Sequence, residues 1–231
     1  MPKKTTAITE DSMLLMDHVR RGDLAGWNRV LQQKATIDLN HLCLHGADLR
    51  GICFAGANLA RAEFIGCDLR SADFTVAEIN DANFTKSRLR AAQFIGCQAM
   101  RARFDRVELP SASFIRASLQ EASFIGALAS KSDFTDAELA DANFQGADLR
   151  GTVFQRALLR QADLRLADFS AAVLTDANLE NAKLGGSELA TAVLDGVRLT
   201  GTNYSVEDLK QSLNRAKLFD HDASKKKEAN I

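Results

Sequence analysis

The stretch FAGANLARAEFIGCDLRSADFTVAEINDANF, residues 54–84, repeats every five residues and decides the fold. A large apolar residue, here called the centre, returns at each fifth position, as at Phe54, Leu59 and Phe64. The frame runs unbroken from Leu39 to Tyr204, and 32 of its 34 centres are large and apolar. A period this short and this long sustained indicates a solenoid.

A second column of small residues lies two positions before each centre, and alanine fills 22 of its 34 places. Eleven of the 14 glycines occupy the last position of the unit, where a corner of the chain needs an unusual backbone angle. From Phe54 to Phe154, phenylalanine recurs every ten residues. With four edges per coil, these rings would form two opposite walls of a narrow, well-filled square core.

The unit A-[D/N]-[L/F]-x-x, held in frame over about 167 of 231 residues, resembles the pentapeptide-repeat proteins. This resemblance implies an all-β solenoid, a right-handed quadrilateral parallel β-helix of about eight coils with four pentapeptides per coil. At ~4.8 Å between stacked strands, the tower would be ~40 Å long.

The sequence outside the repeat predicts short helical caps at both ends. We expect a disordered lead-in at 1–9, an N-terminal helical cap at 10–35, the β-helix at 36–204, a C-terminal helix at 205–220 and a disordered tail at 221–231. A cap would protect the open first coil from edge-to-edge association; the alternative is that the Trp27 face docks a partner. Because fluoroquinolone-resistance members of the family dimerise through their C-terminal ends, the resemblance also permits a homodimer through the C-terminal helix.

The composition excludes several classes of function. With 29 basic and 30 acidic residues, the chain has no global field that favours nucleic acid, and we expect no direct nucleic-acid binding. We find no signal peptide and no apolar run of membrane length, so we expect a cytoplasmic protein without membrane contact. The four cysteines indicate no disulfide framework.

The chain also lacks the usual signs of catalysis. No histidine lies between Gly46 and Asp220, and no phosphate-binding loop or nucleophile elbow is present. His41 and His45 are read as surface residues, because no Cys-x-x-Cys or carboxylate cluster completes a zinc set. We therefore expect a protein that is not an enzyme, with no catalytic residue, cofactor or metal.

Charges gather in columns when residues twenty apart are placed on one wall. One wall carries acids just before its centres and arginines just after them, and the arginines are expected to neutralise the acids; the alternative is a recognition surface. A basic girdle, opposed only by Asp105, crosses the middle of the tower and consists of Lys86, Arg88, Arg90, Arg101, Arg103 and Arg106. The candidate interaction surface comprises Asp48, Asp68, Asp148, Asp168, Glu188, Arg50, Arg70, Arg90, Arg101, Arg103 and Arg106.

The sequence predicts irregular structure at three places. At Ala99 and Ala129 the large centre is replaced by alanine, beside Met100 and Leu128. These places predict either bulges or outward apolar side chains that touch a partner. Pro110 follows a centre, and its missing donor predicts a local distortion.

These features favour a non-enzymatic protein-interaction module that presents a rigid, charged β-helical surface to a macromolecular partner. The alternative is a DNA mimic of the Qnr type, which the resemblance implies would bind DNA gyrase or topoisomerase IV and modulate quinolone sensitivity. Three departures weaken that alternative: a net charge near zero, a frame without loop insertions, and centres of the A-D-L type. The partner's identity stays open.

Overall fold

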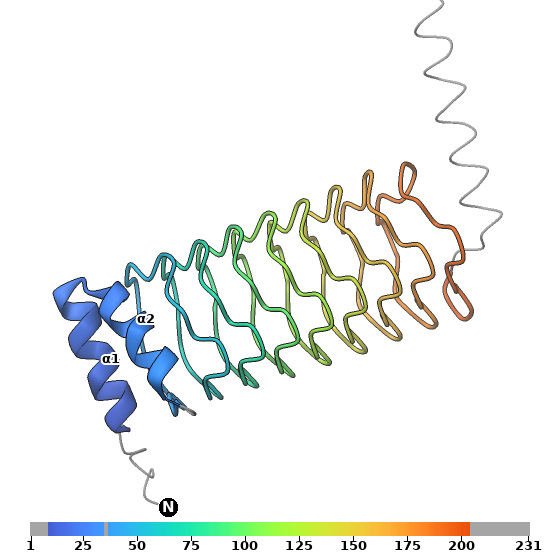
Figure 1. Cartoon of the computed structure of the whole chain (residues 1–231). Coiled ribbons are helices and arrows are strands. Elements are labelled where there is room, and N and C mark those ends of the chain that lie inside the picture. Colours follow the sequence, from blue (N-terminus) through green and yellow to red (C-terminus); the bar gives the residue numbers. More distant parts are fainter. Residues whose placement is uncertain (1–8, 35–36, 204–231) are drawn as a thin grey trace, which may run out of the picture.

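The computed structural model describes residues 9–34 and 37–203. The predicted C-terminal helix at 205–220, the tail at 221–231 and most of the lead-in lie outside these residues. Figure 1 shows a tower of stacked coils with two helices, α1 (Glu10–Arg21) and α2 (Leu24–Gln33), at its N-terminal end. Neither helix is long and apolar enough to cross a membrane.

A register of twenty residues builds the tower. Every residue that precedes a centre, from Asp38 to Asn178, forms a parallel bridge with the residue twenty positions later. Each coil therefore contains four pentapeptides and has four sides. We name the four walls after the centres of the first coil: the Leu39 wall, the Leu44 wall, the Leu49 wall and the Phe54 wall. The right-handedness implied by the family resemblance stays a prediction.

The backbone hydrogen bonds explain why the unit has five residues. In a unit that lies between two other coils, one amide closes the turn, one bonds the previous coil and two bond the next coil. In the Phe64 unit, these bonds run from Ala62 N to Leu59 O (3.0 Å), Glu63 N to Leu42 O (2.7 Å), Phe64 N to Asn83 O (2.8 Å) and Gly66 N to Thr85 O (3.0 Å). The amide of the residue after the centre is left without a backbone partner.

The aspartate and asparagine column supplies the missing acceptor. The side-chain oxygen of the residue before the centre accepts the amide of the residue after it, as from Thr75 to Asp73 (2.9 Å) and from Thr85 to Asn83 (3.1 Å). Short Asp and Asn side chains are suited to such local bonds in turns. Where Asp or Asn precedes the centre, its side chain therefore stabilises the turn as well as contributing to the surface.

Each corner of the coil requires a left-handed backbone. Every corner residue from His41 to Gly186 has φ between 50° and 73°, and most of these residues are not glycine. Positive φ at only the third residue of a four-residue turn is the geometry of a type II turn. A non-glycine residue there costs about 1–2 kcal/mol, which the hydrogen bonds between coils must offset.

The predicted distortion at Pro110 is wrong, because proline fits the turn that each unit makes. Proline occupies the second turn position, whose amide is not used between coils and where type II turns favour it. The ladder continues on both sides, from Ala91 N to Pro110 O (3.0 Å) and from Ser111 N to Ser130 O (3.1 Å).

Phenylalanine rings fill the core in two stacks. The phenylalanine centres from Phe54 to Phe154 are fully buried and alternate between the Phe54 wall and the Leu44 wall. Rings twenty residues apart stack, as in Phe74 and Phe94, whose centroids are 4.8 Å apart at an interplanar angle of 2°. Rings ten residues apart meet edge to face, as in Phe74 and Phe84, at 5.4 Å and 89°.

The two alanine centres do not interrupt the tower. Ala99 and Ala129 are buried, while Met100 and Leu128 are 37% and 51% exposed. The backbone bonds continue through both sites, so of the two predicted alternatives the structure has the outward apolar side chains and not the bulges.

The helix pair contacts the edge of the first coil. Trp27 is buried in edge-to-face contact with Phe54, and its Nε1 donates to the Cys53 carbonyl (2.9 Å). Asn28 Oδ1 accepts the Cys53 amide (2.8 Å), and Asp11 Oδ2 accepts the Asp38 amide (2.9 Å). The alternative that the Trp27 face docks a partner is wrong, because this face is occupied by the first coil.

Replacing Phe104 by alanine removes a ring that stacks on Phe84 and Phe124, with centroids 5.0 Å and 4.8 Å away. We expect the resulting cavity to lower the free energy of unfolding by about 3–5 kcal/mol in urea denaturation. Ile125→Ala, on the outer face of the same wall and 39% exposed, is the control and should cost less than about 1 kcal/mol. Equal losses in both variants would contradict a buried Phe104.

Candidate interaction surface

Aspartate and arginine pair in two-pronged contacts on the Leu49 wall. Arg50 donates from Nε and a terminal nitrogen to the two carboxylate oxygens of Asp48 (2.8 and 2.7 Å), and Arg70 bonds Asp68 in the same way. Each pair flanks one centre, so both side chains leave the wall side by side. Asp68 also lies 3.6 Å from Arg88 of the next coil. Such charge-assisted, two-pronged bonds are among the stronger polar contacts in proteins.

The arginines shift the titration of their acids. Hydrogen bonds from Arg70 lower the pKa of Asp68, with a further contribution from the charge of Arg88. The hydrogen bonds from Arg50 likewise lower the pKa of Asp48, and Arg150 lowers the pKa of Asp148. The predicted neutralisation of the acidic column by its arginines is thus confirmed at Asp48, Asp68 and Asp148, whose carboxylates contact arginines of their own wall.

The other predicted surface residues lie apart from this group. Asp148, Arg150 and Asp168 form a second cluster higher on the Leu49 wall, with Arg150 Nε 3.7 Å from Asp168, and Glu188 is the bridge partner of Asp168 one coil further. Arg103 pairs with Asp105 (3.1 Å) on the Leu44 wall.

The basic girdle has more opposing charge than the sequence indicated. The sequence predicts that Asp105 is the only acid facing it, but Arg101 also pairs with Asp81, twenty residues earlier in the chain (2.8 Å). Among the described residues, Arg90 and Arg106 form no ion pair.

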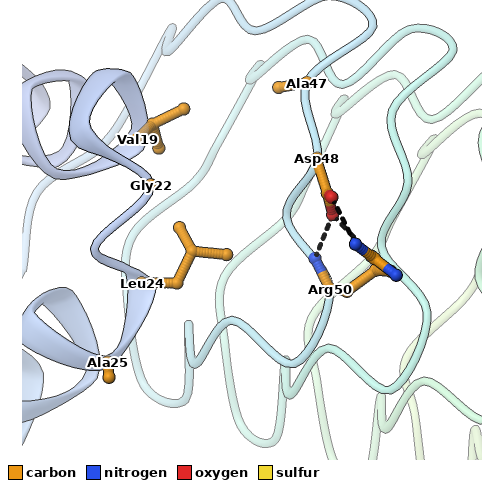
Figure 2. A pocket seen from close by; sticks show the side chains of 7 residues that line it. All are labelled: Val19, Gly22, Leu24, Ala25, Ala47, Asp48 and Arg50. Atoms are coloured by element: carbon orange, nitrogen blue, oxygen red, sulfur yellow. Dashed lines mark hydrogen bonds and ion pairs between the residues drawn. The ribbon is translucent and has the colours of Figure 1, made fainter.

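Two adjoining hollows lie where the helix pair meets the Leu49 wall. The first, of about 480 Å³, separates the α1–α2 connection from the first coil, and Figure 2 shows Leu24 and Val19 facing Asp48 and Arg50 across it. The second, of about 470 Å³, follows the stacked arginines up the wall. Arg50 lines both. We call the two together the Arg50 groove, lined by Val19, Gly22, Leu24, Ala25, Ala47, Asp48, Arg50, Gly51, Arg70, Ser71, Arg90 and Ala91.

The groove has an apolar end and a basic end. Val19, Leu24, Ala25 and Ala47 supply the apolar lining beside the helices. Over the first three coils, the Leu49 wall carries four guanidinium groups, those of Arg50, Arg70, Arg88 and Arg90, against the two carboxylates of Asp48 and Asp68. The local excess is therefore positive, although the chain as a whole is near neutral.

Sequence reasoning found the arginines of this groove and missed its apolar lining. The sequence pattern places Val19 and Leu24 on helices, but the position of these helices beside the first coil depends on how they dock. Arg88 occupies a position in the acidic column, between Asp68 and Glu108 in the twenty-residue register. This position in the sequence could have predicted its contact with Asp68.

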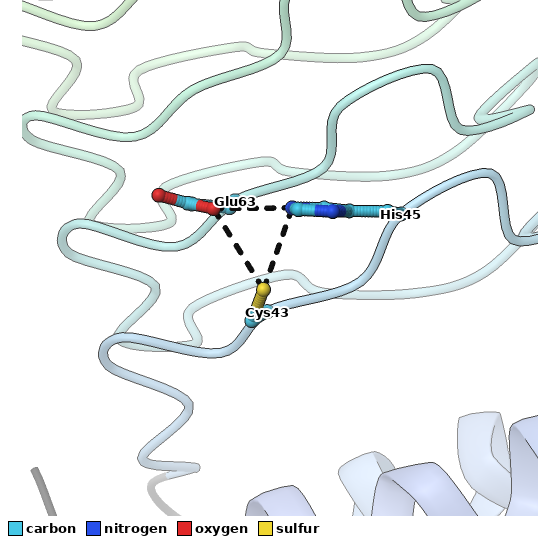
Figure 3. A group of neighbouring side chains, drawn as sticks. All are labelled: Cys43, His45 and Glu63. Atoms are coloured by element: carbon cyan, nitrogen blue, oxygen red, sulfur yellow. Dashed lines mark hydrogen bonds and ion pairs between the residues drawn. The ribbon is translucent and has the colours of Figure 1, made fainter.

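A second polar group, on the Leu44 wall, joins residues from two coils. Cys43, His45 and Glu63 form a triangle, shown in Figure 3, with distances of 3.4 Å from Sγ to Nε2, 3.7 Å from Sγ to Oε2 and 3.1 Å from Nε2 to Oε2. Burial, together with the neighbouring charge of Glu63, raises the pKa of the Cys43 thiol. Sequence reasoning missed this group because Glu63 is separated from Cys43 by twenty residues.

The remaining thiols show no comparable surroundings. All four cysteines are free. Cys67 and Cys97 are buried in the small column of the core, where burial raises the pKa of Cys97 to about 12. A thiol with so high a pKa stays protonated and serves as a small apolar side chain.

Asp68→Asn removes the ion pairs of Asp68 but keeps the turn bond to the amide two residues on. Asn58 and Asn83 show that an asparagine oxygen also accepts this amide. At neutral pH we expect the variant to lose up to about 1 kcal/mol of stability. Since the pKa of Asp68 is lowered in the folded state, its contribution is present above the unfolded pKa, about 3.9, and is lost as the pH falls through the folded value.

The difference in urea midpoint between wild type and Asp68→Asn should therefore disappear at low pH. Asp73→Asn is the matched control, because Asp73 makes the turn bond to Thr75 but no ion pair among the described residues. Its pH-dependent difference should be smaller. An equal difference in both variants would contradict the ion pairs as its cause.

Comparison with protein families accounts for nearly the whole tower. A family model described as "Pentapeptide repeat region" matches residues 37–114, and one described as "Pentapeptide repeats (8 copies)" matches four overlapping segments between residues 117 and 203. No curated protein sequence matches the chain.

Several solved structures are similar to this chain. One is HetL, a pentapeptide repeat protein involved in heterocyst differentiation regulation from the cyanobacterium Nostoc sp. strain PCC 7120. HetL is 24% identical with a TM-score of 0.38, and the match covers 78% of this chain and 93% of HetL. QnrB1, a plasmid-mediated fluoroquinolone resistance protein, is 21% identical in its trypsin-treated form, with a TM-score of 0.47 and coverage of 79% and 96%. By its repeats, the chain belongs to the pentapeptide-repeat family.

Proposed function

We propose that this chain is a non-enzymatic protein-interaction module that holds a segment of its partner in the Arg50 groove. The observation that carries the proposal is that an apolar hollow adjoins a row of arginines, with Arg50 lining both. The coils behind the groove are tied together by backbone bonds, such as Leu49 N to Asp68 O (2.8 Å) and Leu69 N to Arg88 O (2.8 Å). A surface ordered in advance loses little conformational entropy on binding.

The chemistry of the groove defines the partner segment. An apolar side chain would seat between Val19, Leu24 and Ala47, and carboxylates further along the segment would meet Arg70 and Arg90. The arginines repeat with the coil spacing of ~4.8 Å, so an extended segment places two or three acidic residues within their reach. Guanidinium groups suit carboxylates because they bind them through two parallel hydrogen bonds.

Arg90 is the best placed of these arginines. It is exposed and forms no ion pair among the described residues, so binding a carboxylate there would break no internal contact. Arg50 and Arg70 would share their free donors between their own aspartates and the partner.

The Arg50 groove gives less support to the alternative, a DNA mimic directed at gyrase or topoisomerase IV. Mimicry of DNA needs an extended negative surface, whereas Asp48 and Asp68 are paired with arginines and accept amides of their own wall. The excess charge on the Leu49 wall over the first three coils is positive. We therefore rank the acidic partner segment first.

The proposal is tested by charge reversal at Arg90. A photo-reactive residue at Ser71, inside the groove, captures partners in cells that contain the protein, and the affinity of the captured protein is then measured for wild type and Arg90→Glu. We expect the reversal to weaken binding at least about tenfold and added salt to weaken wild-type binding.

Arg116→Glu is the matched control, because Arg116 is, like Arg90, an exposed turn residue without an ion pair among the described residues, and its reversal changes the net charge equally. It should leave the affinity unchanged. The same affinity for wild type and Arg90→Glu would contradict the groove as the binding surface. Inhibition of DNA gyrase supercoiling that survives Arg90→Glu would instead support mimicry of DNA.

A further inference from the structure

We propose that Cys43, His45 and Glu63 form a binding site for one divalent transition-metal ion of the Zn²⁺ type. The three ligand atoms, Sγ, Nε2 and Oε2, lie within 4.8 Å of one another on the outer face of the Leu44 wall. The proposal is independent of the Arg50 groove, which lies on another wall.

The register of the fold places these side chains together. Cys43 and His45 flank the buried centre Leu44, so both side chains leave the same face of the chain. Glu63 is the bridge partner of Cys43 on the next coil, and Leu44 N donates to Glu63 O at 2.7 Å. Two further bonds between these coils, Glu63 N to Leu42 O (2.7 Å) and Gly46 N to Ile65 O (3.0 Å), fix the ligands to a rigid backbone.

The separations between the three atoms suit tetrahedral coordination. Zinc binds sulfur at about 2.3 Å and nitrogen or oxygen at about 2.0–2.2 Å, which sets ligand-to-ligand distances of about 3.3–3.7 Å around a tetrahedral ion. The observed distances are 3.1, 3.4 and 3.7 Å. Small rotations of exposed side chains are enough to admit the ion.

The donor types also select the ion. A thiolate, an imidazole and a carboxylate form a mixed set that suits zinc, whereas calcium and magnesium prefer oxygen ligands. Among the described residues, no lysine or arginine forms an ion pair with Glu63, so no resident cation competes for its carboxylate.

The site offers three protein ligands and leaves one position open. Cys43 and His45 flank one centre, and Glu63 and Ile65 flank the centre above it on the next coil. Of these four outward residues, Ile65 is the one whose side chain carries no donor atom. His45 and Glu63 are about half exposed, with side-chain exposures of 53% and 48%. Water or a ligand from a partner would complete the tetrahedron, as in zinc sites that keep an open position.

The test is titration of the full-length protein with Co²⁺, followed by calorimetry with Zn²⁺. We expect one ion per chain, a thiolate-to-cobalt charge-transfer absorption, and loss of that absorption in Cys43→Ser. Cys43→Ser and Glu63→Gln should each weaken Zn²⁺ binding at least about tenfold, since even outer partners of a metal site contribute that much. Zn²⁺ should also raise the melting temperature of the wild type and not of Cys43→Ser.

Matched controls are Cys53→Ser and Glu78→Gln, which change the same residue types at the same repeat position on other walls. Both should bind the ion as the wild type does. The chain itself carries serine at this position at Ser113 and glutamine at Gln98, so the substitutions are compatible with the fold. Absence of the thiolate absorption in the wild type, or Zn²⁺ binding by Cys43→Ser equal to the wild type, would overturn the proposal.

Discussion

The backbone hydrogen bonds between adjacent coils, which keep a register of twenty residues, are the interaction on which the rest of the molecule depends. In units that lie between two other coils they use three amides, as in the Phe64 unit, and a fourth amide closes the turn. The pleated edge between two corners is so short that each wall has one inward centre, one small inward residue and two outward side chains. Core, surface and corners all repeat because this ladder repeats. The cost is a left-handed backbone at each corner, which most corner residues accept without being glycine.

The ladder also decides which surface charges are free to act on a partner. Aspartates before the centres accept the orphan amide of the turn, and several of them hold an arginine two residues on. A column of acids on such a tower is therefore not by itself a negative surface. What remains available is the arginine row, above all Arg90, and the hollow beside the helix pair. Both the proposed groove and the proposed metal site arise where side chains of adjacent coils meet outside the ladder.

Much of the fold could be predicted because the period assigns every residue to a wall. The centres, the small column and the two phenylalanine stacks follow from counting by five and by twenty, as Phe74 and Phe94 illustrate. The prediction of a distortion at Pro110 is wrong because it assumes that proline removes a bond between coils. The residue directly after a centre donates no such bond, so proline removes nothing from the ladder. The buried position of Trp27 depends on helix docking, which no repeat encodes.

The candidate sites were predictable only in part. Counting by twenty on the Leu49 wall found the arginines and their acids. The same count on the Leu44 wall would have joined Glu63 to Cys43 and His45, but their spacings of two and eighteen residues along the chain resemble no familiar metal motif. The apolar half of the Arg50 groove needed the structure, because Val19 and Leu24 come from outside the repeat.

Residue-resolved amide hydrogen exchange tests the central claim, the five-residue hydrogen-bond pattern within a twenty-residue register, most directly. The account predicts slow exchange at Phe94 and Phe114, whose amides bond Ser113 O and Asp133 O (both 2.7 Å). It predicts fast exchange at Ile95 and Ile115, which follow these centres and whose amides have no backbone partner in the ladder. Equal protection at all four amides, or protection that varies with a period other than five, would contradict it.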